Sequence, residues 1–394
     1  MVKYDQGNRL GDSFHEPVIL TQEHGYSYGG TAGDAFDLED PISLTSKDAV
    51  VGAYQYCMSS SISLAAASRA VSGGKQAFAS TVSVLLESAY ESSGSRLEIS
   101  CLYGQSGIGD VPDTGATVEV TSTTALLQFS AATWATGIWA GAEGAKLQFY
   151  DLDDDALISS STDAVFTVTL VDNLNKRVTV TGTATGIDAL DVAVQAGGVR
   201  AYFKGSKTND MTGLKLILSN TGTLFGISAA AFGLWKGNSF NAAGALTVEK
   251  VLAFNATLVG RGAKGDMVLM VSPVTWGSLN AEQSALRMLD SSYSSTKFEN
   301  GTESIKYHGQ RGAIEVVANP MVKEGDAFMF IPKDLHRIGS AERDGEIATQ
   351  EKNPFYPLAS QAGFGFRIFS DQAIHCRRPA RAAYISGVIN PTVS

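Results

Sequence analysis

Cysteine is scarce in this sequence. Its three cysteines, Cys57, Cys101 and Cys376, lie far apart and are odd in number. They can form neither a disulfide framework nor a metal knuckle built on a C-x-x-C spacing. We therefore expect free thiols in a reducing compartment.

Charge is also scarce. Charged residues make up 18% of the 394 residues, against about 25% in an average soluble chain, and small residues, including 41 glycines, take their place. A surface with so little charge predicts broad contact areas that partner molecules cover. The formal net charge of −10 argues against tight binding to nucleic-acid phosphates, because proteins that bind them carry a basic surface.

Long apolar runs are absent as well. No stretch approaches the roughly 18 uninterrupted apolar residues that indicate a membrane-spanning helix, and the N-terminal residues lack the apolar core of a signal peptide. We expect a protein that is made and kept inside a cell and that has no membrane partner.

Motifs for catalysis and metal binding are missing too. The acidic run from Asp151 to Asp155 resembles a calcium-binding loop, but Ala156 and Thr162 stand where that loop needs a glycine and a bidentate glutamate. A solvated acidic turn is the favoured interpretation, with an adventitious ion at a subunit boundary as the alternative. We expect no catalytic residue, no cofactor and no metal site. The sequence has no G-x-S-x-G motif, and none of its five histidines has a metalloenzyme spacing: His15, His24, His308, His336 and His375.

The N-terminal part of the sequence predicts an extended arm, a hairpin and a long helix. The first residues are rich in Gly, Asp, Tyr and Ser and have no helical period, so we expect hairpin strands near Glu16–Gln22 and Ala49–Tyr56. Over residues 61–98 apolar side chains recur every three or four positions, with a break at Gly73-Gly74. This pattern predicts one long, kinked helix.

The rest of the sequence predicts an α+β body. Residues 146–228 are dominated by Val, Thr, Leu and Asp with turn signals between them, which is typical of an inserted β-rich unit. Helical and strand patterns alternate after it. The expected helices are Ala131–Ala142, Thr247–Val259 and Ser278–Leu289, the last with a serine cap, and the expected strands are Asp266–Ser272 and four segments after Gly312.

Three segments resemble those of one known family. Residues 69–109, which end in LYGQSGIG, are similar to its spine helix and the glycine-rich exit of that helix. Residues 223–239 (TLFGISAAAFGLWKGNS) are similar to the segment before its axial domain, and FRIFSDQAIHCRRPARAAYISGVI near the C-terminus is similar to the strand pair that closes its peripheral domain. The family is the major capsid proteins of tailed bacteriophages, with the Hong Kong 97-type fold, and the resemblance covers nearly the whole chain.

The resemblance implies a fold class and a division of the chain. The fold is α+β, a Hong Kong 97-like capsid fold with an inserted β-rich subdomain. In chain order the expected parts are 1–16 as N-terminal arm, 17–60 as extended loop, 61–145 as peripheral domain with the spine helix, 146–228 as inserted β-rich domain, 229–350 as axial domain and 351–394 as C-terminal strands of the peripheral domain.

The resemblance also implies a function. The chain is expected to be a major capsid protein that assembles in the cytoplasm of a bacterial host into an icosahedral head, the virion capsid, around double-stranded DNA. Its expected partners are copies of itself in pentamers and hexamers, a separate scaffolding protein, a portal and possible decoration proteins. The alternatives are an encapsulin-like nanocompartment shell and a β-rich phage tail or adhesion protein. We predict no Lys–Asn crosslink, because the extended loop offers only Lys47 and no clear asparagine.

Charge is unevenly placed along the chain. Residues 1–60 hold nine acidic and three basic residues, whereas residues 365–394 hold four arginines and one aspartate. In the resembled family the N-terminal arm and the extended loop lie over neighbouring subunits. We therefore expect the acidic and the basic residues to meet between copies; solvation of both groups is the alternative. The candidate contacts are Asp34, Asp37, Glu39 and Asp40 on one copy and Arg377, Arg378 and Arg381 on the next.

Overall fold

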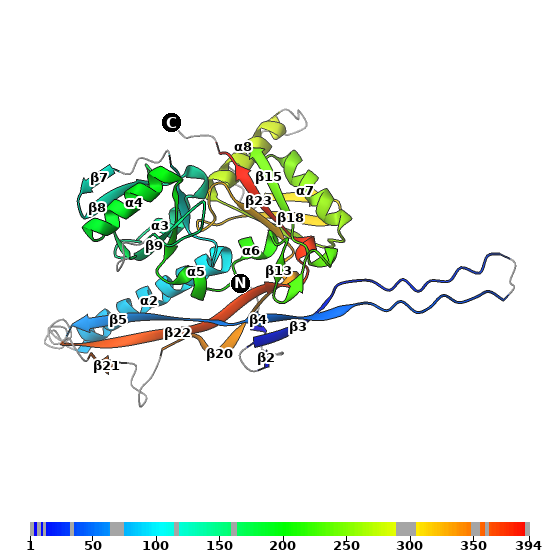
Figure 1. The fold of residues 1–394 in the computed structure, drawn as a ribbon, viewed down its shortest axis with the longest axis horizontal. Helices are drawn as coiled ribbons and strands as arrows, with labels where there is room; N and C mark the ends of the chain where they lie inside the picture. The colour runs from blue at the N-terminus through cyan, green and yellow to red at the C-terminus, as the bar shows by residue number, and fades with distance from the viewer. Residues whose placement is uncertain are drawn as a thin grey trace.

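The protein has a two-sheet body, a layer of long strands below it and a hairpin that projects far from one end (Figure 1). The computed structural model describes residues 4–5, 9–10, 13–31, 35–63, 75–113, 118–158, 164–288, 305–347, 355–358 and 362–390.

The first sheet of the body has seven antiparallel strands in the order β6-β12-β9-β10-β11-β8-β7. Helix α4 (Ala184–Ala196) packs on it through Ile187, Leu190 and Val194, and the Thr183 side chain caps the helix by accepting from Gly186 N. The strands are β6 (Gly109–Val111), β7 (Val118–Thr121), β8 (Thr124–Gln128), β9 (Lys146–Asp151), β10 (Phe166–Asp172), β11 (Arg177–Thr181) and β12 (Val199–Phe203).

The second sheet of the body has six strands in the order β15-β23-β19-β16-β18-β17, with β16 parallel to β18 and β15 parallel to β23. Helices α7 (Val248–Gly260) and α8 (Pro273–Met288) belong to the same unit. The strands are β15 (Ser239–Gly244), β16 (Met267–Val271), β17 (Ile305–Gly309), β18 (Gly312–Ala318), β19 (Ala327–Phe330) and β23 (Ala383–Val388).

The six-stranded sheet separates two hydrophobic cores. Along β16 alternate side chains point to opposite faces: Leu269 and Val271 join the core under α7 and α8, whereas Val268 and Met270 pack against the core shared with the seven-stranded sheet. Two short helices between the sheets help to fill that shared core: α3 (Thr136–Trp139) and α6 (Leu214–Leu218). The short elements η1 (Ala131–Thr133) and α5 (Ser206–Asn209) lie near them in the chain and bury no residue. Trp134 and Trp139 are fully buried there, with ring centroids 5.4 Å apart.

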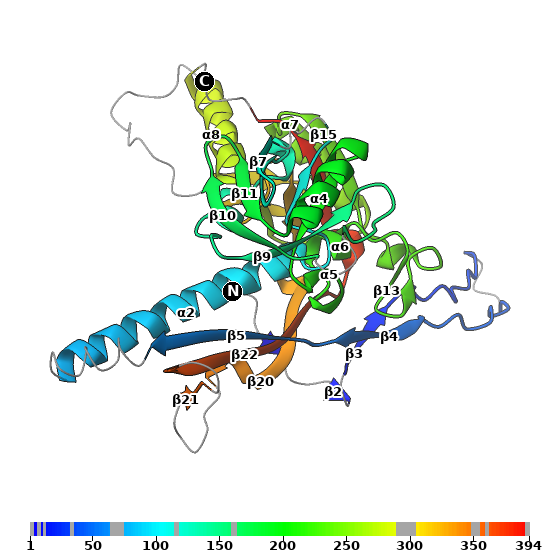
Figure 2. The same ribbon diagram turned by 60° about the vertical axis from the view of Figure 1, so that its left-hand side comes forward.

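The long strands form a third layer with helix α2. Helix α2 (Lys75–Tyr103) has 29 residues, which corresponds to about 44 Å, and it runs beside β5 and β22 below the body (Figures 1 and 2). Leu86 and Ala89 of the helix pack on Phe366 and Ile368 of β22. The sheet contains β1 (Tyr4–Asp5), β20 (Leu335–Ile347), β22 (Gly363–Cys376) and β21 (Tyr356–Pro357), with β5 (Tyr54–Ser63) paired to β22.

Most predicted elements are confirmed. The hairpin strands are β3 (Ser13–Ile19) and β4 (Ser46–Gly52), about three residues before their predicted positions, and β2 (Arg9–Leu10) pairs with β3. Helix α7 begins after Thr247, whose side chain accepts from Lys250 N. The four strands predicted after Gly312 are β18, β19, β22 and β23. The small elements that complete the fold are β13 (Thr223–Leu224), β14 (Ile227–Ser228), η2 (Gly233–Trp235), η4 (Pro332–Asp334) and η5 (Pro379–Arg381).

The predicted start of the long helix was wrong. Residues 61–63 end strand β5, where Ser63 pairs with Gly363, and the described helix begins at Lys75. The predicted break at Gly73-Gly74 lies outside the described residues. Pairing with a partner strand some 300 positions away in sequence leaves no local trace, so periodicity extended the helix too far.

Helix α8 also begins earlier than predicted. Its first residue is Pro273, and Ser272 caps it because the Ser272 hydroxyl accepts from Thr275 N at 3.2 Å. Ser278, the predicted cap, lies inside the helix and donates to Val274 O. Helix α4 went unpredicted within the Val- and Thr-rich stretch, although Ile187, Leu190 and Val194 have helical spacing.

Two sheet pairings differ from the predicted organisation. The seven-stranded sheet crosses residue 146, because β8 pairs with β11 and β6 pairs with β12. Strands β22 and β23 do not pair with each other. Strand β22 pairs with β5, β20 and β21, whereas β23 lies between β15 and β19. The turn at η5 redirects the chain, and Asn238 Nδ2 holds it by donating to Ala380 O and Ala382 O.

Candidate subunit interface

The projecting hairpin is anchored firmly at its base. Strands β3 and β4 pair over seven positions, and their inward side chains Val18 and Ala49 are buried with Ile227 and Trp235 in a small core of their own. Val50 N donates to Phe225 O at 3.0 Å, which ties β4 to the loop before β14. The base therefore belongs to the body and can hold the outer part in a defined direction.

Residues 21–31 and 35–45, which we call the arm, extend beyond this base as two facing strands of chain (Figure 1). Leu20 N donates to Thr45 O at 2.9 Å and His24 N to Ile42 O at 3.2 Å. Farther out, Glu39 N donates to the Ser27 hydroxyl at 2.7 Å. These bonds hold the two strands together but provide no core, since only one residue layer is present.

The arm exposes large apolar side chains. Tyr28 is 90% exposed and Leu38 81% exposed. Side chains of this size outside any core indicate an interaction surface. Others on the arm are also exposed: Tyr26, Phe36, Ile42 and Leu44.

The predicted acidic contacts lie on the same arm. Asp37, Glu39 and Asp40 are exposed, and they alternate with the apolar Phe36 and Leu38 along the chain. Asp34, the fourth predicted acidic contact, lies outside the described residues. The arm thus combines apolar and acidic groups on a segment that the body does not cover.

The predicted arginines have different environments. Arg377 already has a partner in its own chain: its Nε donates to Glu16 Oε1, and Glu16 is buried in the hairpin base. Sequence reasoning missed this ion pair, because the two residues are 361 positions apart. Arg377 N also donates to Asp334 O at 2.9 Å, so this part of the chain is fixed to the η4 turn.

Arg378 and Arg381 are the more accessible members of the group. Arg378 is exposed and Arg381 is half-buried. Burial raises the pKa of Asp334, and the nearby charges of both arginines act against this shift. Burial also lowers the pKa of Arg381, with Arg378 contributing in the same direction. The pair forms a small basic surface that could receive a carboxylate from outside.

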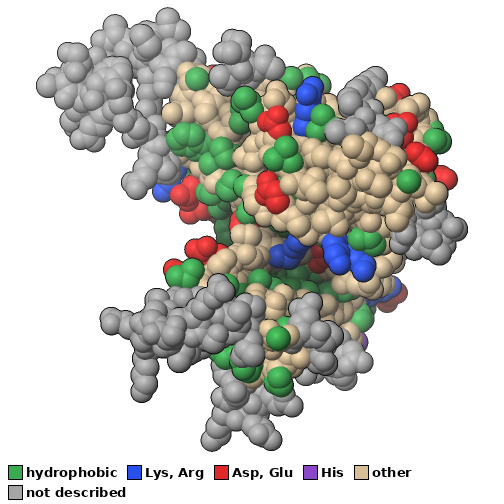
Figure 3. Space-filling view, turned by 90° about the vertical axis from the view of Figure 1, so that its left-hand side faces the viewer, with side chains coloured by type: hydrophobic (Ala, Val, Ile, Leu, Met, Phe, Trp, Pro, Cys, Tyr) green, Lys and Arg blue, Asp and Glu red, His purple; other side chains and the backbone are tan. Residues whose placement is uncertain are grey.

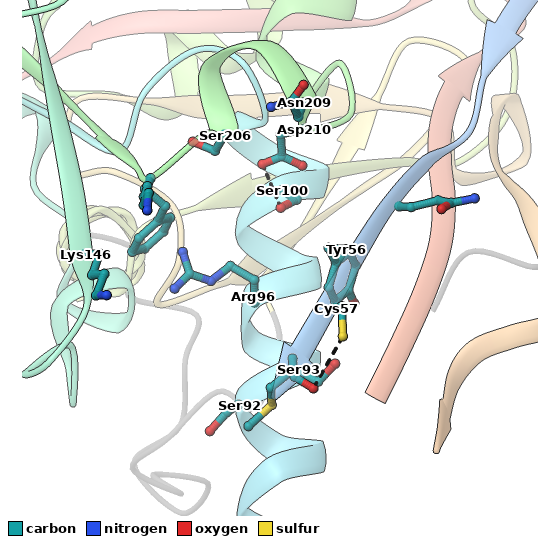
Figure 4. A pocket seen from close by; sticks show the side chains of 15 residues that line it. Tyr56, Cys57, Ser92, Ser93, Arg96, Ser100, Lys146, Ser206, Asn209 and Asp210 are labelled. Carbon is teal, nitrogen blue, oxygen red and sulfur yellow. Dashed lines mark hydrogen bonds between the residues drawn. The ribbon is translucent and has the colours of Figure 1, made fainter. Parts of the chain in front are cut away.

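A second surface feature is a cleft between α2, β5 and the β12–α5 turn (Figure 4). Arg96 of α2 points into it and stacks on Phe203, with its guanidinium carbon 3.1 Å from the ring centroid. Burial lowers the pKa of Arg96 to about 10. Lys146 and Lys204 also line the cleft, and the space-filling view of this side of the molecule shows Lys and Arg side chains gathered beside a hollow (Figure 3).

The lining of the cleft contains no serine–histidine pair. The Ser100 hydroxyl donates to Asp210 Oδ2 at 2.9 Å, and burial raises the pKa of that aspartate. No histidine is among the residues that line it, so the serine lacks the positioned base of a hydrolytic triad. Among the described residues, no group of three or more His, Cys, Asp or Glu side chains is placed to hold a metal ion.

The acidic run at 151–155 forms a turn, as predicted. Asp151 Oδ1 accepts from Asp153 N and Asp154 Oδ1 from Ala156 N, the bonds expected of aspartates that shape a turn. The Lys207 ammonium pairs with Asp155.

In the described part of the chain, no helix is both long and apolar enough to cross a membrane.

A known capsid structure resembles this arrangement over almost its whole length. The capsid asymmetric unit of cyanophage A-1(L) matches 97% of this chain and 90% of its own, with 12% identity and a TM-score of 0.54. The chain has the fold of a phage capsid protein. The capsid of a native GTA particle matches 98% of this chain and 88% of its own (8% identity, TM-score 0.45). The encapsulin of Synechococcus elongatus matches 43% of this chain and 61% of its own (10% identity, TM-score 0.26).

The capsid fold was predicted correctly at the level of a mixed α and β architecture. No protein-family model matches the sequence, and no curated protein matches it either. The likeness therefore lies in the arrangement of the elements, which the 12% identity to the cyanophage chain leaves almost invisible in sequence.

Proposed function

We propose that the chain is a major capsid protein that assembles into a closed icosahedral head around double-stranded DNA. The observation that carries this proposal is the arm, on which the described residues leave large apolar side chains exposed, Tyr28 and Leu38 most of all. In a capsid fold, a second copy would cover these side chains. Contacts between unlike surfaces of identical chains close into rings when the rotation allows, and many modest contacts then add up to a stable particle.

The geometry of the arm favours a head-to-tail contact. The arm leaves one end of the molecule. Strand β5 ends and helix α2 begins at the opposite end (Figure 1). We propose that Asp37, Glu39 and Asp40 of one copy lie near Arg378 and Arg381 of the next. We leave Arg377 out of this contact, because its guanidinium is bonded to Glu16 of its own chain.

We also propose a role for each part of the chain. Residues 1–16 are the N-terminal arm and 17–60 the extended loop, whose last residues lie in β5. Helix α2 is the spine helix, which forms the peripheral domain together with the long strands β20 and β22. The six-stranded sheet is the axial domain. The inserted domain is the seven-stranded sheet, and we place its start before residue 146 because β6 and β8 pair inside it.

The proposed role is structural, not enzymatic. A net charge of −10 disfavours tight binding of the wall to DNA, which would obstruct packaging and release. The proposed partners are copies of the chain in pentamers and hexamers, a separate scaffolding protein, a portal and decoration proteins. The proposed location is the virion capsid, after assembly in the cytoplasm of the host.

Electron microscopy of the purified protein, with and without a co-expressed scaffolding protein, tests this function. Closed shells of regular size are expected. Fibres would instead favour a tail or adhesion protein, and shells that retain a specific cargo enzyme would favour an encapsulin-like compartment. Monomers under every condition, including with the scaffolding protein, would contradict the proposal.

A further inference from the structure

Residues 319–326, which we call the junction segment, connect the two sheets of the body. The segment leaves β18 and enters β19 of the six-stranded sheet. Its backbone bonds to the segment between β8 and β9 of the seven-stranded sheet: Glu324 N donates to Trp134 O at 2.9 Å, and Gly325 N to Ala132 O at 2.8 Å. Gly137 N donates back to Pro320 O at 3.0 Å. Three backbone hydrogen bonds thus join the sheets through one short loop.

Lys323 lies at the centre of the junction segment. The residue is 2% exposed, and its Nζ donates to Gly107 O at 3.0 Å. Its backbone N donates to Tyr103 Oη at 2.9 Å, while the ammonium lies 4.3 Å from the centroid of the Tyr103 ring. Tyr103 and Gly107 belong to the end of α2 and the loop that follows it. Lys323 therefore joins the long helix to both sheets.

The charged groups around Lys323 are largely engaged with each other. Asp110 of β6 accepts two bonds from Arg200 of β12, at 2.7 and 3.2 Å. Asp326, at the end of the segment, accepts from Tyr384 Oη of β23 at 2.7 Å, and Lys215 of α6 lies 3.9 Å from its second oxygen. No carboxylate of the described residues comes within ion-pair distance of Lys323 Nζ.

Burial without a direct counter-ion disfavours the charged form of Lys323. An ammonium has three donors, and among the described residues the Gly107 carbonyl is the one hydrogen-bond acceptor of Nζ. Burial, reinforced by Lys215, lowers the pKa of Lys323 to about 7, against the opposing pull of Asp326 and Asp110. A neutral amine keeps the bond to Gly107 O and loses no ionic hydration.

We propose that Lys323 is a proton-dependent latch: its neutral form closes the junction between α2 and the two sheets, and its protonation loosens it. The latch belongs to the single folded chain and goes beyond the proposed capsid function, so either can fail without the other. Its physical basis is a buried amine placed where three packed units meet.

The lowered pKa of Lys323 decides how the stability of the folded chain changes with pH. An unfolded lysine keeps a pKa near 10.4, so between pH 7 and 10 the unfolded chain binds more protons than the folded one. Folding is then favoured increasingly as pH rises through this range, and the equilibrium constant for unfolding falls by up to about tenfold per pH unit. Below the folded pKa both states are protonated and this contribution to the slope disappears.

Denaturant unfolding of the full chain from pH 6 to 9 tests the latch. Relative to the wild type, Lys323→Met should lose this pH dependence and be more stable at pH 6, because methionine fills the space without a charge. Lys250→Met, which removes a half-buried lysine of α7 that also donates to backbone carbonyls, is the control and should keep the wild-type slope. Equal slopes for wild type and Lys323→Met would overturn the proposal.

Hydrogen exchange provides a local test that needs only the wild-type chain. After correction for intrinsic exchange rates, the amides of Glu324 and Gly325 should exchange faster at pH 6 than at pH 8.5. Amides in the pairing of β16 with β18 should change much less. If Lys323→Met fails to fold, this comparison still decides the matter, and equal protection of the junction amides at both pH values would rule out a latch.

Discussion

The arm and the junction segment differ in how far the chain itself covers and bonds their side chains. The arm exposes Tyr28 and Leu38 almost completely and makes few bonds to the rest of the chain. The junction segment buries Lys323 and Asp326 and bonds to several elements of the body. A region whose apolar side chains stay exposed within one chain indicates a partner. A region whose side chains are buried and bonded within one chain stabilises the monomer.

The difference predicts how mutations will separate folding from assembly. Changes in the arm should affect assembly and leave the free energy of unfolding almost unaltered, because no core depends on its side chains. Changes at the junction should affect the stability of the monomer, because the bonds of Lys323 and Asp326 there are buried.

Removal of the arm should have the largest effect. Replacing residues 22–43 with a short Gly-Ser turn keeps β3, β4 and the bond from Leu20 N to Thr45 O. We expect shell formation to be abolished, while the unfolding free energy changes by less than about 1 kcal/mol. Electron microscopy and denaturant unfolding measure the two quantities. The double variant Tyr28→Ser and Leu38→Ser is a milder form of the same test, and normal shells from both variants would refute the role given to the arm.

A single hydroxyl at the junction should have the next largest effect. Tyr103→Phe removes the acceptor for Lys323 N and leaves a buried donor without a bond. We expect the unfolding free energy to fall by about 1–3 kcal/mol, as measured by denaturant titration. Tyr90→Phe, on the same helix but 47% exposed, should change it very little. A Tyr103→Phe variant as stable as the wild type would show that the junction tolerates the loss.

The ion pair at the hairpin base should matter less. Glu16→Gln keeps the shape of the side chain but weakens the bond from Arg377, and we expect a loss of about 1 kcal/mol because the arginine is partly exposed to solvent. The loss should shrink in high salt. Asp48→Asn, at an exposed carboxylate of the same hairpin, is the control. A loss that salt does not change would mean that packing, not charge, holds the two residues.

Charge reversal between copies should have the smallest effect per contact. An exposed ion pair contributes about 0–1 kcal/mol, so Arg378→Glu should leave the monomer fold intact and slow shell formation only because the contact repeats in every subunit. Arg377 is left unchanged in this test because it serves the hairpin base. Combining Arg378→Glu with Asp37→Lys should restore part of the assembly rate, as followed by light scattering. Unaltered kinetics for the single variant would remove this contact from the interface.

Local patterns explain most of what could be predicted. Thr247 caps α7, and the uninterrupted apolar run of β16 marks it as a buried strand. Both signals are contained within a dozen residues. The strand β5 and the cap at Ser272 show the limit: β5 depends on its distant partner β22, and two serines six positions apart competed for the same cap.

The sequence by itself determined the exposed character of the arm, the acidic turn at 151–155 and the alternating elements of the body, because composition and short-range periodicity decide these. Only the tertiary structure decided that Arg377 is bonded to Glu16, that β23 leaves β22 for another sheet, and that Lys323 is buried against Gly107. Each of these contacts joins residues more than 50 positions apart. Their energies depend on burial and on the position of a partner atom, and neither is encoded in any short stretch of the chain.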